Sequence, residues 1–232
     1  PFLVGRILAG IKLWLQLMSG LGSRLDVRTA AKIYFMGQLG KYGAGSVWPV
    51  LAQMELGREH HIPRRRSIVA MLSAIALSLA TALALAAFTV PLLSENTHHL
   101  WWLMIPVPFL VVMLHPRVLW GLFRRLPRLK LVEGQAAPSM SAMLKAAGWC
   151  LLGWLSYGLH VAVLASAFHA GNIGSLLTAS VGGYALAWCA GLIVFLLPAG
   201  AGARDLALIA VLAPSVHTGP ALAVAVISRT VS

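Results

Sequence analysis

Long apolar stretches alternate with short polar segments along most of the chain. A helix that crosses a bilayer needs roughly 20 apolar residues. Residues 67–90 carry no charge and meet this requirement, and residues 100–122 form the next candidate, which three prolines should bend. Residues 146–203 contain no Lys, Arg, Asp or Glu, which leaves room for two spans, at 146–168 and 175–197. The pattern therefore predicts several successive membrane-crossing helices.

The two ends of the chain follow the same pattern less regularly. Residues 1–22 form a candidate span that Arg6 and Lys12 interrupt. Near the other end, the pattern predicts a short helix at 206–213, a turn at 214–220 and a last helix that begins near Ala221. Because the chain begins without Met and ends within a helical pattern, we expect one domain, 1–232, truncated at both ends.

Glycines break the apolar pattern in two places, and both suggest helices that enter the membrane without crossing it. Apolar residues at 33–39 and 47–54 flank Gly40, Gly43 and Gly45, which predicts two short helices around a glycine turn. A re-entrant hairpin of this kind is tolerated where protein or water covers the bare backbone. The second interruption, at 198–205, is again rich in glycine. The prediction is an all-α polytopic integral membrane domain with about six spans and two re-entrant segments.

Small residues recur at every fourth position of the uncharged helix 67–90. They are Ala70, Ala74, Ser78, Ala82 and Ala86. Such a ridge lets a neighbouring helix approach closely.

Composition supports the membrane assignment and excludes several classes of protein. Hydrophobic residues make up 59% of the chain and charged residues 10%. In a soluble domain, hydrophobic residues make up about 45–50% and charged residues about 25%. This excludes a soluble enzyme, a disordered tail and a disulfide-stapled secreted module. The net charge is +12. Basic residues gather in cytoplasmic loops beside anionic lipids, so we expect membrane lipids and no nucleic acid as partners.

The loop charges also predict an orientation in the cell membrane. The segment 58–66 and the loop 117–145 are strongly basic, whereas the turns 91–99 and 169–174 carry no Lys or Arg. The basic loops are therefore placed inside and the turns outside. The localisation predicted is a multi-pass protein of the plasma membrane.

Residues that often carry chemistry are scattered. Cys150 and Cys189 each stand alone in an apolar run and are interpreted as small core residues. His160 and His169 are interpreted as core or interface histidines. No nucleophile–base pattern, nucleotide loop or metal-ligand spacing stands out, so the sequence predicts no cofactor, no metal and no catalytic residue.

The turn at 40–49 is a candidate anion site. Its glycines allow close backbone approach, Ser46 could cap the following helix, and Lys41 lies beside the helix start. Backbone N–H groups at a helix N-terminus favour an anion. The alternative is an ordinary loop between two helices, and this segment by itself favours the loop.

The segment 198–205 is the stronger candidate. Between Ala146 and Ser228, Arg204 and Asp205 are the only residues of the types Lys, Arg, Asp and Glu. Charges at membrane depth usually face a cavity or a partner, and the fork of Arg can bind two phosphate oxygens. The alternative is that Arg204 snorkels to the interface and pairs with Asp205. Arg229 either completes a basic pocket or anchors a helix end.

These two glycine segments together resemble the flippase-like membrane domain family, which is the transmembrane domain of lysylphosphatidylglycerol synthases and its stand-alone relatives. The first family motif is close to Gly-Lys-Tyr-x-Pro-Gly-x-x-Trp, and the second is close to Pro-x-Gly-x-Gly-x-Arg-Glu with a later Ser-Arg. The matching residues are Gly40, Lys41, Tyr42, Gly45, Trp48, Pro198, Gly200, Gly202, Arg204, Ser228 and Arg229. Three departures stand out. Ala44 replaces a proline, Asp205 replaces a glutamate, and helix 67–90 lacks an acidic residue that many members have.

The resemblance implies re-entrant helices around a cavity for a lipid headgroup, and movement of a charged or glycosylated phospholipid or polyprenyl-phosphate lipid between leaflets. The substrate-binding residues predicted are Lys41, Tyr42, Gly43, Gly45, Trp48, Pro198, Gly200, Gly202, Arg204, Asp205 and Arg229. One alternative is a non-transporting scaffold for a separate glycosyltransferase or lipid synthase, which would then be a protein partner. A second is a membrane enzyme acting on lipid phosphates, with Asp205 as the evident carboxylate. The apolar surface also leaves room for a homo-oligomer.

Overall fold

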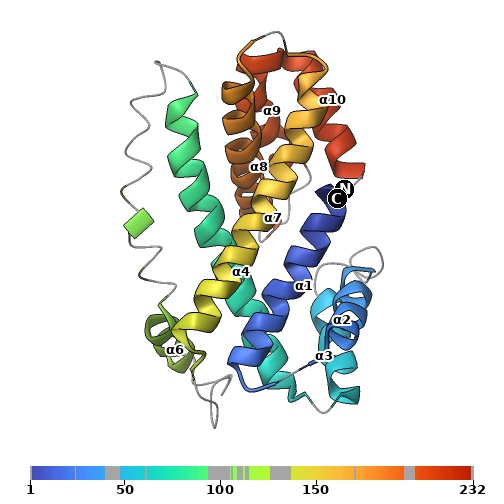
Figure 1. Cartoon of the computed structure of the whole chain (residues 1–232), viewed down its shortest axis with the longest axis vertical. Helices are drawn as coiled ribbons and strands as arrows, with labels where there is room; N and C mark the ends of the chain where they lie inside the picture. The colour runs from blue at the N-terminus through green and yellow to red at the C-terminus, as the bar shows by residue number, and fades with distance from the viewer. Residues whose placement is uncertain are drawn as a thin grey trace. The chain divides into compact units, whose positions relative to one another are not determined.

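The computed structural model describes residues 2–23, 25–39, 48–60, 62–93, 105, 107–108, 112, 115–125, 137–169, 171–195 and 202–230. Its helices are α1 (Phe2–Gly20), α2 (Val27–Leu39), α3 (Trp48–Glu59), α4 (Arg64–Thr89), η2 (Val90–Leu92), α6 (Pro116–Arg124), α7 (Met140–Ser166), α8 (Ile173–Phe195), α9 (Ala203–Val216) and α10 (Thr218–Thr230) (Figure 1). No residue within those ranges belongs to a β-strand. The all-α class predicted from the sequence is confirmed.

Three helical segments of the described chain are long and apolar enough to cross a membrane. They are Arg64–Leu92, Met140–Ser166 and Ile173–Leu192. A helix suits the bilayer because it satisfies its own backbone hydrogen bonds, while apolar side chains can face lipid. Helix α7 shows this outward face, with Leu152, Leu155 and Val163 about half exposed. These segments overlap the spans predicted at 67–90, 146–168 and 175–197.

The predicted bent span at 100–122 needs a correction at its end. His115 has an extended backbone (φ −60°, ψ 129°), and a separate helix, α6, begins at Pro116. Proline is well suited to the first turn of a helix, because its missing N–H would have no intrahelical partner there. The His115 ring accepts a hydrogen bond from the Arg117 N–H, which caps the new helix. The proline therefore starts a helix instead of bending one. Most of 100–115 lies outside the described residues.

The predicted turn at 214–220 is also wrong. Helix α9 continues through Pro214 to Val216, and the chain breaks only at His217, whose φ is 65°. Proline removes one donor and fixes φ near the helical value, so one in the last turn costs a single hydrogen bond. Helix α10 then begins at Thr218.

The contacts within the chain divide it into two compact units. Unit 1 comprises Pro1–Ile7, Leu79–Val111 and Leu151–Ser232, and unit 2 comprises Leu8–Ser78 and Val112–Cys150. Of the 18 Lys and Arg residues, only Arg6, Arg204 and Arg229 belong to unit 1. The basic charge of the chain is therefore concentrated in unit 2.

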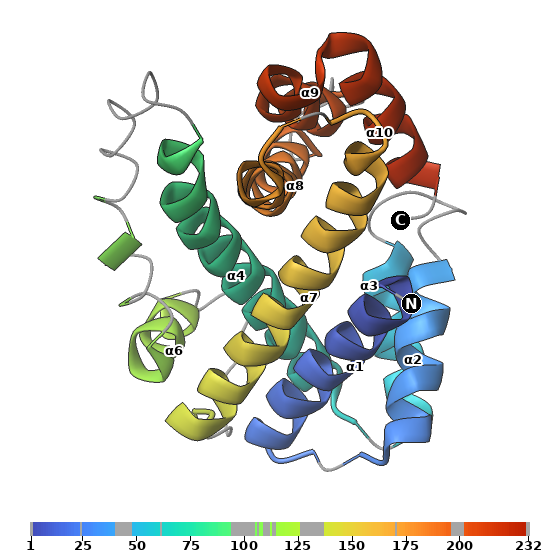
Figure 2. The same cartoon turned by 45° about the horizontal axis from the view of Figure 1, so that its top comes forward.

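Unit 2 contains the pair of short helices that the first glycine-rich segment predicts. Helix α2 packs against α3, and both views show the two side by side (Figure 2). Asp26 caps α2, since its carboxylate accepts hydrogen bonds from the N–H groups of Arg28 and Thr29, each at 3.1 Å. These bonds favour the charged carboxylate, and contacts with Thr29 contribute most to lowering the pKa of Asp26 below its ordinary value. The turn itself, 40–47, lies outside the described residues.

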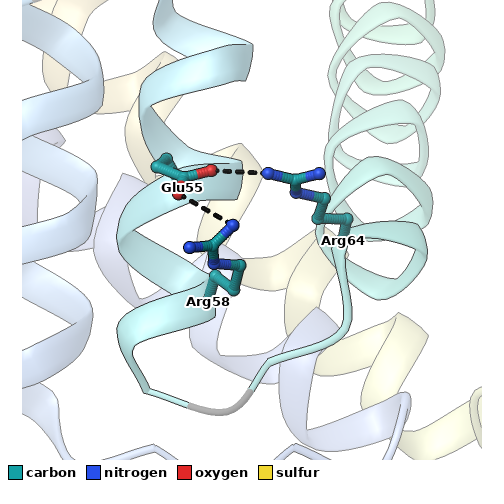
Figure 3. A network of polar contacts seen from close by, with 3 residues as sticks. All are labelled: Glu55, Arg58 and Arg64. Carbon is teal, nitrogen blue, oxygen red and sulfur yellow. Dashed lines mark hydrogen bonds and ion pairs between the residues drawn. The ribbon is translucent and has the colours of Figure 1, made fainter.

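An exposed ion-pair network links the end of α3 to the start of α4. The Arg64 guanidinium donates a hydrogen bond to the Glu55 carboxylate at 2.8 Å, and Arg58 lies 3.3 Å from its other oxygen (Figure 3). The hydrogen bond from Arg64 is the main reason that the pKa of Glu55 is lowered below its ordinary value. Arg66 extends the junction by donating to the Ser23 hydroxyl at 2.6 Å.

The small-residue ridge on α4 is mostly buried, as its spacing predicts. Ala70, Ala82 and Ala86 are each at most 4% exposed. In unit 2, Ser78 contacts the Cys150 thiol at 3.5 Å. In unit 1, the Trp154 indole donates to the Thr81 hydroxyl at 3.0 Å. Helices α4 and α7 thus combine close packing with polar contacts inside an apolar sequence.

Helices α7 and α8 of unit 1 approach so closely that only glycine fits at their contact. A Cβ added at Gly158 would lie 2.6 Å from the backbone Cα of Val181. A Cβ at Gly183 would similarly lie 3.1 Å from Val211 Cβ, where α8 packs against α9. The glycines therefore set the spacing of three helices.

We expect Gly158→Ala to lower the stability of the protein by about 1–3 kcal/mol, because the added methyl group collides with backbone that cannot rotate away. Gly148→Ala is the matched control on the same helix, since nothing lies within 4 Å of its added Cβ. Thermal unfolding in detergent, followed by tryptophan fluorescence, should show a lower Tm for the first variant only. Equal Tm values for the two variants would contradict the close approach.

The Glu55 network predicts a pH-dependent effect of small size, since the three side chains are exposed. A lowered pKa means that the stabilisation is present above the ordinary Glu range and is lost as pH falls through the folded-state value. Glu55→Gln should therefore lower Tm slightly at pH 7, and its difference from wild type should shrink below about pH 4.5. Glu59→Gln removes the same charge from the same helix and should leave Tm unchanged at pH 7. A pH-independent difference for Glu55→Gln would contradict this origin.

Candidate functional site

A left-handed glycine places Arg204 in the first turn of α9. Gly202 precedes the helix with φ 116°, a conformation that strains residues with a side chain. Its carbonyl accepts a hydrogen bond from the Leu206 N–H at 2.8 Å, which closes the first turn. Asp205 lies in the same turn, where the positive end of the helix dipole favours a carboxylate. Both charged side chains are half-buried.

The Arg204 side chain packs onto α8. Its guanidinium donates a hydrogen bond to the Tyr184 hydroxyl at 3.0 Å and lies 5.1 Å from the centroid of that ring. Helix α9 comes this close because Gly191 has no side chain, and a Cβ there would lie 3.2 Å from Arg204 Cβ. Tyr184 itself is 1% exposed. The Arg204 charge therefore lies against a polar aromatic side chain of the neighbouring helix.

Tyr184 is one half of a stacked pair. The rings of Tyr157 on α7 and Tyr184 on α8 have centroids 4.2 Å apart and planes that differ by 14°. On α1, the Arg6 guanidinium lies 4.6 Å from the centroid of the Tyr157 ring. We call Arg6, Tyr157, Tyr184 and Arg204 the arginine–tyrosine cluster. All four belong to unit 1.

The cluster offsets part of the cost of burying two cations. An arginine over an aromatic face gains about 0.5–1 kcal/mol when exposed and about 2 kcal/mol when desolvated. The hydrogen bond from Arg204 to a phenol oxygen adds to this. Trp154 and Trp188 extend the aromatic surface. The ring centroid of Trp154 lies 6.3 Å from that of Tyr184 and 5.2 Å from that of Trp188. Two positive charges are thus held against one group of aromatic rings.

The structure describes only some of the predicted site residues. Gly202, Arg204 and Asp205 are described in full. Trp48 is the first residue of α3 and Arg229 lies in the last turn of α10, but their side chains are outside the described set. The following lie wholly outside the described residues: Lys41, Tyr42, Gly43, Gly45, Pro198 and Gly200. The first motif belongs to unit 2 and the second to unit 1.

Sequence reasoning missed three members of the cluster. Arg6 gave a signal, because it is a charge inside an apolar helix, but it counted only as an interruption of a span. Tyr157 and Tyr184 gave none, since a tyrosine in a membrane helix is usually a packing residue and the two lie on different helices. Their stacking depends on how α7 and α8 cross.

Two buried cysteines and a half-buried histidine have the packing roles predicted for them. Cys150 and Cys189 are free and buried. The His169 ring lies within hydrogen-bond distance of the carbonyl oxygens of Ser215 (2.9 Å) and Asn172 (3.1 Å), which ties the α7–α8 turn to the end of α9. In the described part of the chain, no group of three or more His, Cys, Asp or Glu residues could hold a metal ion.

We expect Tyr184→Phe to lower stability by about 1.5–3 kcal/mol, the range for a hydrogen bond to a charged group. The ring stack would survive, but Arg204 would lose the Tyr184 oxygen as an acceptor. Tyr157→Phe is the matched control, since the Tyr157 hydroxyl has no hydrogen-bond partner among the described residues. Its Tm, measured without added lipid, should equal or exceed that of wild type. A similar loss in both variants would mean that the Arg204 contact contributes little.

Comparison with known proteins gives one match. The sequence profile of the family described as "Lysylphosphatidylglycerol synthase TM region" matches residues 2–232. No curated protein and no solved structure matches the chain.

Proposed function

Since this chain belongs to the lysylphosphatidylglycerol synthase transmembrane-region family, and is therefore a membrane protein linked to lipid metabolism, we propose that it moves a lipid between leaflets. The lipid has a charged or glycosylated phosphate headgroup, either a phospholipid or a polyprenyl-phosphate lipid. The membrane is the plasma membrane, which the chain crosses several times. Three apolar helices long enough to span a bilayer support this placement.

The observation that carries the proposal is the position of Arg204. Its side chain is half-buried and bound to Tyr184 of α8, a helix long enough to cross the bilayer. Ionisable groups at membrane depth are costly and usually mark a substrate path. A guanidinium binds two phosphate oxygens at once and stays charged at every physiological pH. Arg204 would therefore hold the lipid phosphate.

The start of α9 supports the same role. Gly202 turns the chain in the left-handed region, and the first N–H groups of a helix have no intrahelical acceptor. Discontinuous helices of transporters point such N–H groups at anionic substrate groups. In this proposal, the turn at 200–202 offers N–H groups to the phosphate. Asp205 either orients Arg204 or meets a cationic part of the headgroup.

Other predicted residues enter the proposal through charge and the family motif. Lys41 and Arg229 would add positive field, and the turn at Gly43 and Gly45 would offer further backbone N–H groups. Tyr42, Trp48 and Pro198 would line the headgroup site, as the family motifs imply.

The test is a leaflet-exchange assay in liposomes. Purified protein would be reconstituted with fluorescent phosphatidylglycerol, its lysyl derivative or a polyprenyl-phosphate sugar, and dithionite would quench the outer leaflet. We expect exchange of one lipid class, slowed about tenfold or more by Arg204→Ala, because one charge-assisted contact is worth about 1.5–3 kcal/mol. Arg204→Lys should retain part of the rate, since it keeps the charge but not the fork.

Lys145→Ala is the control, because it removes one exposed positive charge from unit 2 and should exchange lipid at the wild-type rate. Equal rates for wild type and Arg204→Ala would place the transport path elsewhere. No exchange of any of the three lipids would favour a scaffold role instead.

A further inference from the structure

Hydrogen-bond donors outnumber acceptors around the Tyr184 hydroxyl. Arg204 donates to its oxygen, and the Arg6 guanidinium and the Tyr157 hydroxyl are both close enough to act on it electrostatically. The Tyr184 O–H group is itself a donor, and the Tyr157 hydroxyl is its neighbour in the ring stack. Arginine has no hydrogen-bond acceptor, and a neutral tyrosine hydroxyl carries no negative charge. The cluster thus presents several donors in one place.

The Tyr157 hydroxyl is a buried polar group at the centre of the cluster. Tyr157 is 2% exposed, and its oxygen has no hydrogen-bond partner at normal geometry among the described residues. Stacking holds its ring beside Tyr184, with centroids 4.2 Å apart. A buried hydroxyl without a partner destabilises a fold, and each such group calls for an explanation.

A buried nitrogen atom without a partner lies beside the Tyr157 ring. His160 packs edge-on against Tyr157, with centroids 6.2 Å apart, and its Nε2 atom is buried without a partner in the described part of the chain. The cluster therefore contains unused hydrogen-bonding capacity on α7 as well as two cations.

Arg6 supplies its cation from the other end of the sequence. It lies over the Tyr157 face, whereas Arg204 lies against Tyr184. Gly5 lets α1 approach α7, since a Cβ there would lie 3.2 Å from the Ser156 hydroxyl. The other charged residues of unit 1 are Arg229, Glu95 and Asp205, so Arg6 and Arg204 are two of its three guanidinium groups.

We propose that Arg6 and the Tyr157 hydroxyl, together with Arg204 and Tyr184, form an anion site that binds a phosphate ester. Resting on the proposed function, this assigns Arg6 and Tyr157 to the headgroup site and makes a phosphate the group recognised. A phosphate offers several acceptor oxygens and at least one negative charge, which matches two guanidinium groups and two phenol donors. The same chemistry would accept a lipid phosphodiester or free inorganic phosphate.

The test measures binding, so it does not depend on transport. The protein in dodecyl maltoside micelles would be titrated with dihexanoyl phosphatidylglycerol, and native mass spectrometry would count bound lipid. Dihexanoylglycerol, which has the same chains but no phosphate, is the matched ligand. Inorganic phosphate at constant ionic strength would be added as a competitor.

Arg6→Gln removes one cation and should weaken phosphatidylglycerol binding about tenfold or more. Tyr157→Phe should weaken it by about three- to tenfold, and Arg6→Lys should fall between wild type and Arg6→Gln. Lys145→Gln, an equal loss of charge in unit 2, should bind as wild type does, and dihexanoylglycerol should not distinguish the variants. Competition by inorganic phosphate would identify a soluble anion as a ligand of this site, and its absence would restrict the site to lipid.

Wild-type affinity in both Arg6→Gln and Tyr157→Phe would overturn the proposal, as would an equal loss in Lys145→Gln, which would indicate diffuse attraction. Tyr157→Phe keeps the ring stack, so the test survives even if Arg6→Gln fails to fold. Weaker binding in these variants, combined with no leaflet exchange by wild type, would remove the transport function and leave the anion site standing.

Discussion

Holding two guanidinium groups inside a nearly uncharged helical unit is the constraint on which the rest of unit 1 depends. A cation in a low-dielectric environment is costly unless polar or aromatic groups replace its water. Here one stacked tyrosine pair does so for Arg6 and Arg204 together, through ring faces and one phenol oxygen. The rings must then lie within a few ångströms of both cations. This requirement fixes how α1, α7, α8 and α9 approach one another within the unit.

Glycine makes these approaches possible. Gly158 and Gly191 leave room where α7 meets α8 and where α8 meets α9, and Gly202 allows the left-handed turn before Arg204. Larger residues at the first two positions would push apart the helices that present the tyrosines and Arg204. Packing and electrostatics are therefore coupled, since the small residues that give van der Waals contact also set the distances of the cation–π contacts.

The two units differ in what their charges do. Unit 2 contains most of the Lys and Arg residues, including the exposed Arg58 and Arg64, which pair with Glu55. Such exposed basic residues suit the lipid headgroup region, and each one contributes little to the stability of the fold. Arg6 and Arg204 lie against buried aromatic rings. The high net charge of the chain thus comes mainly from unit 2, whereas the candidate site depends on two half-buried cations of unit 1.

The sequence by itself determined the membrane class, the all-α architecture and the positions of α4, α7 and α8. Hydrophobic length alone decides whether a helix can cross a bilayer, so these predictions need no knowledge of neighbours. It also singled out Arg204, because a lone charge in an apolar run stands out without a structure. Local chemistry misled it at Pro116 and Pro214, since proline can begin a helix or lie in its last turn. Only the tertiary structure decided that Arg204 contacts Tyr184, that Tyr184 stacks on Tyr157, and that Arg6 joins them. These contacts depend on how helices distant in sequence cross, and no residue pattern along one helix encodes that crossing.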